Sequence, residues 1–201
     1  MKNILYLFLI LPFFLLNACK DDDEKVDPNL KTLDVKTINN LNAGASGSAT
    51  ANHYTLFSFK TGLVVPLTDS SGTTWDLGFR GTSIIVNGGT SGPGNAGAIV
   101  KTAALDDVRE ADATGYTLDN GAVFAIPAGS GNGWYTYDGA TNIISPIPGK
   151  VFVIRTADNK YAKFEIVSYY LDAPAVPDLS IPSRYYTFRY VYQPNGTRKV
   201  Y

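Results

Sequence analysis

The chain of 201 residues has only one histidine, one cysteine and one methionine. These residue types supply many of the near-neutral proton carriers, nucleophiles and soft metal ligands of protein sites. With His53 as its single histidine, the sequence excludes a histidine-rich metal site and gives little support to a Ser-His or Cys-His catalytic pair. The acidic group over 106–112 lacks the alternating Asp/Asn pattern and the glycine of a calcium loop. We therefore expect neither catalytic residues nor a metal site, and no enzyme activity.

An excess of charge of one sign is also lacking. The chain carries 17 lysine and arginine residues against 18 aspartate and glutamate residues, which gives a formal net charge of −1. Nucleic-acid binding depends on a basic field that neutralises phosphates. We therefore expect no nucleic-acid partner.

Long hydrophobic runs are missing as well, and the apolar run at 4–16 is too short for a spanning helix, which needs about 20 apolar residues. Lys2 precedes this run and small residues follow it, as in a secretory signal. The run ends in Leu16-Asn17-Ala18-Cys19, which resembles the bacterial lipobox, where the peptide is cut before a cysteine whose thiol is then lipidated. The sequence thus predicts a lipoprotein signal peptide over 1–18 and lipid attachment at Cys19. The alternative is an ordinary secretory signal with an incidental cysteine.

The charge run Lys20-Asp21-Asp22-Asp23-Glu24 directly follows Cys19. Such a run is usually a solvated tether. It also resembles the export signal that sends Bacteroidetes lipoproteins to the outer face of the outer membrane. We therefore expect a lipid-anchored, cell-surface protein of the outer membrane, in which residues 19–48 form the lipidated N-terminus and tether.

Residues 49–201 have the composition of a β domain. Aromatic residues make up 12% of the chain, and its 19 glycines and 11 prolines fall between short β-branched and aromatic runs. This pattern favours strands joined by turns over helices. We predict a single all-β domain, rich in antiparallel sheet, with three hairpins: 54–59 with 63–67, 150–156 with 161–170, and 185–192 with 200–201.

Several segments in order resemble the HmuY family of Bacteroidetes haem-binding lipoproteins. The resemblance runs from about Tyr54 to the C-terminus, and it is carried by Trp75-Asp76-Leu77-Gly78-Phe79, Ile85-Val86-Asn87-Gly88-Gly89-Thr90-Ser91-Gly92, residues 149–163, Tyr169-Tyr170 and Tyr186-Thr187-Phe188-Arg189-Tyr190. It implies an HmuY-like β domain that takes haem from host haemoproteins for iron acquisition and delivers it to a TonB-dependent outer-membrane receptor.

The sequence departs from that family at the iron ligands. The family's two axial ligands are histidines or methionines, whereas here the only methionine is Met1 and His53 precedes the first core strand. Tyrosine is another known haem ligand. Three tyrosines lie in the segment where the family's ligands would fall, which makes Tyr116, Tyr135 and Tyr137 the candidate haem-binding residues, with Trp134 as a candidate pocket wall. Aromatic packing in a sheet-rich core is the alternative explanation for these residues.

Two other functions stay open at this point. An apolar pocket could hold another porphyrin or a different hydrophobic ligand, and the chain could also keep the fold without a pocket, as a surface adhesin or interaction module. We expect haem or a related tetrapyrrole as the ligand, with coordination unlike that of the well-known family members.

Overall fold

The computed structural model describes residues 32–45, 47–48, 52–121 and 123–201, which belong to one unit, Thr32–Tyr201. The predicted signal peptide at 1–18, the lipid attachment at Cys19 and the acidic run at 20–24 lie outside the described residues. Within the described part of the chain, no helix is long and apolar enough to cross a membrane.

Strands dominate the described residues, and all strand pairs are antiparallel. The only helix among them is a short 3-10 helix, η1, at Leu67–Asp69. The strands are β1 (Lys36–Asn42), β2 (Thr55–Ser58), β3 (Leu63–Val65), β4 (Leu77–Arg80), β5 (Ser83–Val86), β6 (Gly97–Thr102), β7 (Tyr135–Asp138), β8 (Ile143–Pro146), β9 (Lys150–Arg155), β10 (Tyr161–Tyr170) and β11 (Ser183–Gln193). This arrangement confirms the predicted all-β fold.

A five-stranded sheet has the order β1-β11-β10-β9-β6. The predicted hairpin of β9 and β10 is confirmed, with Phe164 opposite Phe152 and Tyr161 opposite Arg155. Val151 to Ile154 are all buried in β9, because apolar residues cover both faces of the sheet at this strand. A run without polar alternation is what such two-sided burial requires.

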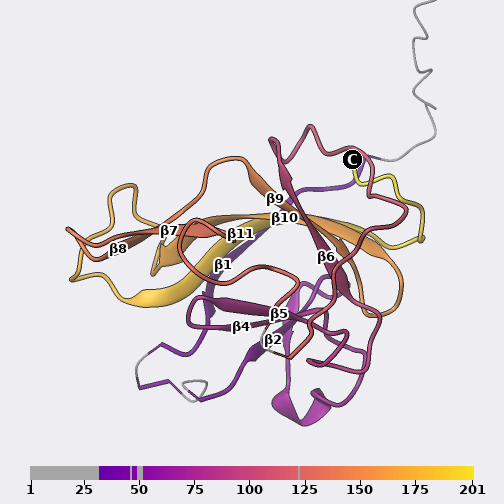
Figure 1. Ribbon diagram of the computed structural model, residues 1–201, viewed down its shortest axis with the longest axis horizontal. Coiled ribbons are helices and arrows are strands. Elements are labelled where there is room, and N and C mark those ends of the chain that lie inside the picture. The colour runs from indigo at the N-terminus through magenta and orange to yellow at the C-terminus, as the bar shows by residue number, and fades with distance from the viewer. Residues whose placement is uncertain (1–31, 46, 49–51, 122) are drawn as a thin grey trace, which may run out of the picture. The chain divides into compact units, whose positions relative to one another are not determined.

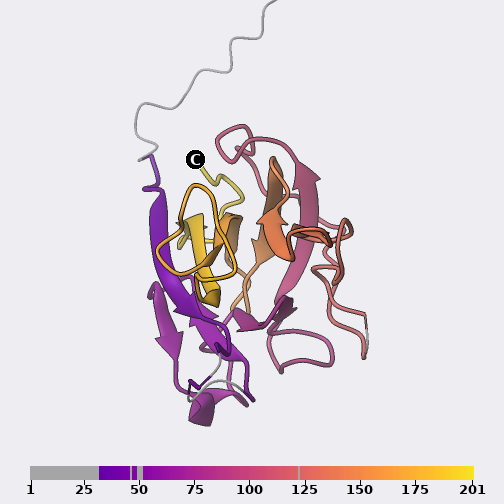
Figure 2. The same cartoon turned by 90° about the vertical axis from the view of Figure 1, so that its left-hand side faces the viewer.

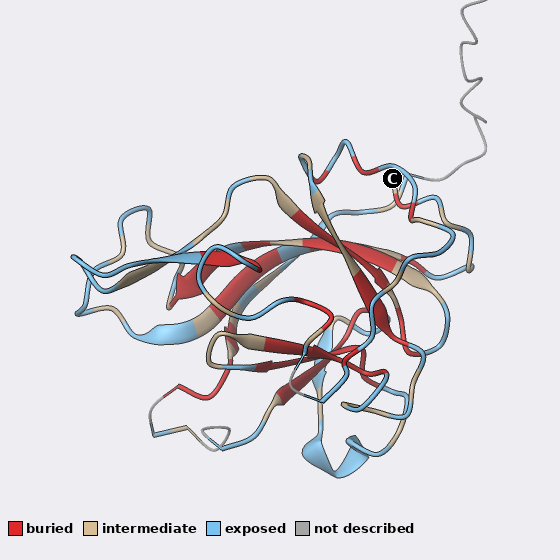
Figure 3. Cartoon of the chain, in the orientation of Figure 1, coloured by how far each residue is buried: buried red, intermediate tan, exposed pale blue. Residues whose placement is uncertain are grey.

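A four-stranded sheet with the order β3-β2-β4-β5 packs against it, below the five-stranded sheet in Figure 1. The predicted hairpin of β2 and β3 is confirmed, with Phe57 opposite Val64. Between the sheets, Phe57 packs edge-on against Phe188 at a centroid distance of 5.2 Å, and Phe79 stacks on Phe188 at 5.6 Å. Figure 3 shows the buried residues concentrated where the two sheets face each other. Aromatic packing therefore joins the layers.

Buried polar side chains tie the loops around this core. The carboxylate of Asp76 accepts hydrogen bonds from the backbone N–H of Phe59 at 2.8 Å and of Ala157 at 3.0 Å, which joins the two sheets. In the glycine-rich segment 87–97, a Cβ on Gly88 would lie 2.0 Å from the backbone oxygen of Ala96. Glycine is therefore needed there for close backbone approach, as expected for a loop of this composition.

Two boundary predictions are corrected. Residues 36–42, placed in the tether by their polar sequence, form β1 and pair with β11, so the described domain begins before residue 49. The final hairpin of 185–192 with 200–201 does not form: β11 pairs with β10 and β1 instead, and the N–H of Val200 bonds to the backbone oxygen of Arg109. Neighbours distant in the sequence satisfy these backbone groups, which local pattern does not reveal.

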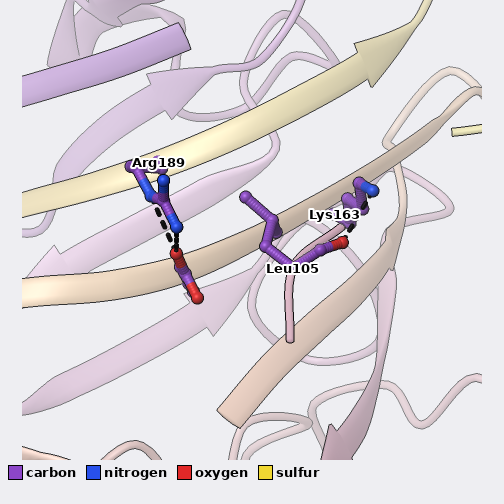
Figure 4. A network of polar contacts seen from close by, with 4 residues as sticks. Leu105, Lys163 and Arg189 are labelled. Carbon is purple, nitrogen blue, oxygen red and sulfur yellow. Dashed lines mark hydrogen bonds and ion pairs between the residues drawn. The ribbon is translucent and has the colours of Figure 1, made fainter. Parts of the chain in front are cut away.

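The outer face of the five-stranded sheet carries a buried lysine. Lys163 is 2% exposed, and its Nζ donates to the backbone oxygen of Leu105 at 2.7 Å (Figure 4). It also donates to the backbone oxygen of Val108 at 2.8 Å. On the neighbouring strand, Arg189 pairs with Glu165. Lys163 thus fastens the segment around 105–108 to the sheet.

Candidate functional site

Two projections lie at the same end of the domain. The β7–β8 hairpin and the connection between β10 and β11 extend together at the left of Figure 1, and Figure 2 looks onto this end. The hairpin is bonded to the end of β10, where this connection begins, because the N–H of Ile144 donates to the hydroxyl of Tyr170 at 2.9 Å. The turn of the hairpin is fixed by Asp138, whose carboxylate accepts from the N–H of Ala140 and the hydroxyl of Thr141.

A cleft lies between these projections. Its larger part is a cavity of about 680 Å³ that is bounded by the hairpin, the β10–β11 connection and the β4–β5 turn. An adjoining cavity of about 430 Å³ is more apolar and includes Ile143, Val176 and Leu179 in its lining. The two cavities share Asp178 and Leu179. Their sizes fall in the range of about 300 to 1,000 Å³ that is typical of small-molecule sites.

In the apolar cavity, two hydrophobic side chains are largely exposed to solvent. Val176 is 83% exposed and Leu179 is 72% exposed. Both belong to the connection between β10 and β11 and line the same cavity as Ile143 of the hairpin. Apolar area left open to water at a concave surface favours the binding of an apolar ligand.

Two arginines line the larger cavity, Arg80 at the end of β4 and Arg184 at the start of β11. The guanidinium of Arg80 lies over the ring of Tyr54, 4.5 Å from its centroid. Arg184 Nη1 donates to the backbone oxygen of Gly44 at 2.9 Å. Among the described residues, neither arginine forms an ion pair with a carboxylate.

The backbone brings these arginines to one place. The N–H of Gly81, next to Arg80, bonds to the backbone oxygen of Ala43, and the N–H of Ala43 bonds to the backbone oxygen of Arg184. Arg184 has a φ of 68°, and the β10–β11 register shifts in this region. A left-handed residue that is not glycine costs about 1 kcal/mol or more, and such irregularities re-aim side chains near functional sites.

Tyr169 and Tyr170 also line the larger cavity, at the end of β10. Burial raises the pKa of Tyr169 to about 12, although the nearby Arg184 guanidinium acts in the opposite direction. The hydroxyl of Tyr170 accepts the N–H of Ile144. Both phenols are therefore engaged in holding the wall of the cavity.

The predicted site residue Tyr116 lies elsewhere, in the hydrophobic cluster on the outer side of the five-stranded sheet. Its hydroxyl donates to the backbone oxygen of Asp112 at 3.0 Å, and its ring is 5.3 Å from the guanidinium of Arg155. Burial, together with the nearby Tyr161 and Asp112, raises the pKa of Tyr116 well above its usual range. These contacts hold Tyr116 as a packed, neutral phenol.

Tyr135 and Trp134 lie one layer behind the cavity. Trp134 is 1% exposed, and its Nε1 donates at 2.9 Å to the backbone oxygen of Thr82, which lines the cavity. The Trp134 ring packs against Tyr135 at 4.7 Å and Tyr169 at 5.4 Å. Trp134 therefore supports the residues that form the wall.

Tyr137 is the predicted tyrosine that borders the cleft. It is 47% exposed on β7, and its hydroxyl donates at 2.5 Å to Asn142 Oδ1, whose residue lines the larger cavity. Tyr137 pairs directly with Ile144, another lining residue. Residues directly opposite on paired strands project to the same face. Tyr137 itself is not among the residues that line the two cavities, but it contacts two that do.

Sequence reasoning did not select Arg80, Tyr169 or Arg184 as site residues. Tyr169 was visible within a segment that carried the family resemblance, and the proline-containing connection at 171–182 held exposed apolar residues. A long connection with apolar side chains between two strands is a signal for a binding loop.

The comparisons with known proteins agree with this architecture. The sequence model of the HmuY protein family matches residues 50–190 of the 201-residue chain. The chain belongs to the HmuY family. This membership confirms the resemblance seen in the sequence.

Solved structures resemble the HmuY-family domain described above. The crystal structure of an apo HmuY analogue from Tannerella forsythia has a TM-score of 0.51 and 14% identity, and the match covers 81% of this chain and 96% of the other. This likeness supports the fold.

Two further structures match with lower scores. One is of a candidate lipoprotein from Bacteroides fragilis (TM-score 0.45, 16% identity, 78% of this chain and 86% of the other). The other is of a candidate HmuY-like heme binding protein from Bacteroides vulgatus (TM-score 0.44, 16% identity, 78% and 89%). No curated protein matches the chain.

Proposed function

We propose that this HmuY-family protein binds haem or a related tetrapyrrole in the cleft between the β7–β8 hairpin and the β10–β11 connection. It acts as a binding protein and not as an enzyme, anchored to the outer membrane at Cys19 and displayed at the cell surface. It passes its ligand to a TonB-dependent outer-membrane receptor.

The cleft itself is the observation that carries this proposal. A tetrapyrrole is a flat apolar ring with carboxylates along one edge, and the cleft joins a cavity lined by Ile143, Val176 and Leu179 to a more polar cavity with two arginines. Placing the ring against exposed Val176 and Leu179 would remove apolar area from water, which is favourable. The cleft thus fits both chemical parts of such a ligand.

Haem iron bound in this cleft would have axial ligands different from the histidines or methionines of the family. The lining of the two cavities contains no histidine, methionine or cysteine among the described residues. His53 is exposed and lines another cavity, of about 290 Å³, which shares Asn52 and Arg80 with the larger one. Tyr137 lies next to the cleft. Among the described residues, its hydroxyl has one side-chain hydrogen-bond partner, Asn142. We propose Tyr137 as the residue that would hold the iron, with the ring bound mainly by apolar contact.

The first test is a titration of the purified protein with haemin and with metal-free protoporphyrin, followed by visible absorbance and tryptophan fluorescence. Leu179→Asp should weaken binding of both ligands about 10-fold or more, because burial of a leucine contributes about 1.5 to 3 kcal/mol. Leu63→Asp is the matched control, because Leu63 is similarly exposed at 65% but does not line the cleft. If neither ligand binds at micromolar concentrations, the tetrapyrrole function is refuted and an interaction module becomes the better explanation.

The second test concerns the iron. Tyr137→Phe should change the haemin spectrum and leave protoporphyrin binding unaltered, whereas Tyr116→Phe should change neither. Tyrosinate coordination to iron(III) gives a high-spin complex without the sharp visible bands of a bis-His or bis-Met site. An unchanged haemin spectrum in Tyr137→Phe would show that the ring binds without this ligand.

A further inference from the structure

Arg80 and Arg184 are placed in the larger cavity as two cationic groups without carboxylate partners among the described residues. A guanidinium has five N–H donors in a planar fork. Arg184 uses Nη1 for the Gly44 carbonyl and also interacts with the hydroxyl of Tyr169, while Arg80 stacks on Tyr54. These contacts fix the two side chains and leave further N–H groups for a ligand.

The position of both arginines is set by the same short segment. Ala43 bonds through its backbone to Gly81 and to Arg184, and Gly44 accepts from the Arg184 side chain. The hydroxyl of Tyr186 also donates to the backbone oxygen of Gly81 at 2.9 Å, which fixes the β4–β5 turn from the core side. A subsite held by backbone bonds and buried aromatic residues is preorganised, so little is lost in ordering it on binding.

One acidic residue lines the same cavity. Asp178 Oδ1 accepts from the N–H of Ser180 at 2.7 Å and from its hydroxyl at 2.5 Å, and these bonds lower the pKa of Asp178. Asp178 and Leu179 mark the junction with the apolar cavity. The cleft is therefore polarised, with arginines in the larger cavity and apolar side chains beyond this junction.

We propose that Arg80 and Arg184 form a carboxylate subsite, which selects a tetrapyrrole by the free carboxylates at the edge of its ring. This inference rests on the proposed function and adds to it the group by which the ligand is recognised. Arginine suits this role because its fork matches the two oxygens of a carboxylate, and such charge-assisted bonds are roughly twice as strong as neutral ones.

The test compares protoporphyrin with its dimethyl ester, which keeps the ring and removes both charges. The parent protein should bind the free acid about 10-fold to 100-fold more tightly than the ester. Each hydrogen bond between a guanidinium and a carboxylate is expected to raise the affinity by about that factor. Binding of the acid should also weaken as salt is raised, while binding of the ester should not. Equal affinity for acid and ester in the parent protein would overturn the subsite and leave the tetrapyrrole function standing.

Variants then assign the subsite to the two arginines. Arg80→Gln and Arg184→Gln should each weaken binding of the acid about 10-fold and change binding of the ester by less than about 2-fold. Arg109→Gln is the control for Arg80, since Arg109 also stacks on a tyrosine ring, 4.6 Å from the centroid of Tyr201. Arg198→Gln is the control for Arg184, since Arg198 Nη1 also bonds to a backbone oxygen, that of Ala111.

Each possible outcome decides the question. If the arginine variants weaken acid and ester equally, the arginines shape the cavity and do not read carboxylates, and the inference fails. If neither compound binds the parent protein, the proposed function fails first. The acid-to-ester ratio of the parent protein needs no variant, so it decides the matter even where a substitution impairs folding.

Discussion

Asp76 offers the sharpest test of how the two sheets are held together. Its side chain is 5% exposed, and its two oxygens accept the N–H groups of Phe59, just after β2, and of Ala157, just after β9. Asp76→Asn keeps the size of the side chain but leaves it with a single acceptor oxygen. At least one buried N–H then faces an NH2 group and loses its partner.

The loss of folding stability expected for Asp76→Asn follows from the lost hydrogen bond. A buried donor without a partner costs about 1 to 3 kcal/mol. In a domain of this size, each kcal/mol corresponds to about 2 to 4 °C in Tm. We therefore expect Asp76→Asn to lower the Tm by about 2 to 12 °C near neutral pH. Asp69→Asn, at an exposed carboxylate in η1, should leave the Tm almost unchanged.

The effect should also depend on pH. Burial raises the pKa of Asp76 from 3.8 to about 6, against the two backbone N–H bonds that lower it. This difference corresponds to about 3 kcal/mol between the protonation states. Because the native state binds the proton more tightly than the unfolded chain, the stabilisation is fully present below about pH 3.8 and is lost as the pH rises through about 6.

Urea unfolding of the parent protein and Asp76→Asn at about pH 4.5 and about pH 7.5 measures this dependence. The parent protein should gain about 2 kcal/mol relative to the variant at the lower pH, since the amide that replaces the carboxyl does not titrate in this range. A difference in unfolding free energy that stays constant between the two pH values would refute the buried, proton-binding carboxyl. A variant as stable as the parent at both pH values would refute the hydrogen-bond argument as well.

Three further predictions concern the anchor, its flanking acids and the buried lysine. Cys19→Ala should move the protein from the membrane fraction to the soluble fraction, because acyl chains contribute about 0.8 kcal/mol per buried methylene; unchanged fractionation would exclude lipidation there. Replacing the three aspartates at 21–23 by alanine should reduce the cleavage of this protein when protease is added to intact cells, without changing the Tm. Unaltered cleavage would show that the acidic run is only a solvated tether. Lys163→Met should lower the unfolding free energy by about 1 to 3 kcal/mol, because the carbonyls of Leu105 and Val108 lose their donor; an unchanged urea midpoint would contradict this.

The strands could be predicted where their pattern is local. In β10, burial alternates only in the middle of the strand, at 164–168, but the sequence alternation still predicted a strand there, and the continuous apolar run of β9 predicted its partner. β1 was missed because its residues 36–42 are mostly polar and form a strand only through pairing with β11. Pairing partners at that distance leave no mark on local periodicity.

For the candidate site too, local sequence predicted some features, and the folded chain was needed for the others. Residue types and patterns within short segments were enough to predict the β fold, the family and the scarcity of iron ligands, and they also predict the export signal. The folded chain was needed to show that Tyr137 borders the cleft while Tyr116 packs on the far sheet face, and that Arg80 and Arg184 share one cavity. Sheet register and backbone bonds between distant segments place those side chains, and neither is encoded in any single stretch of sequence.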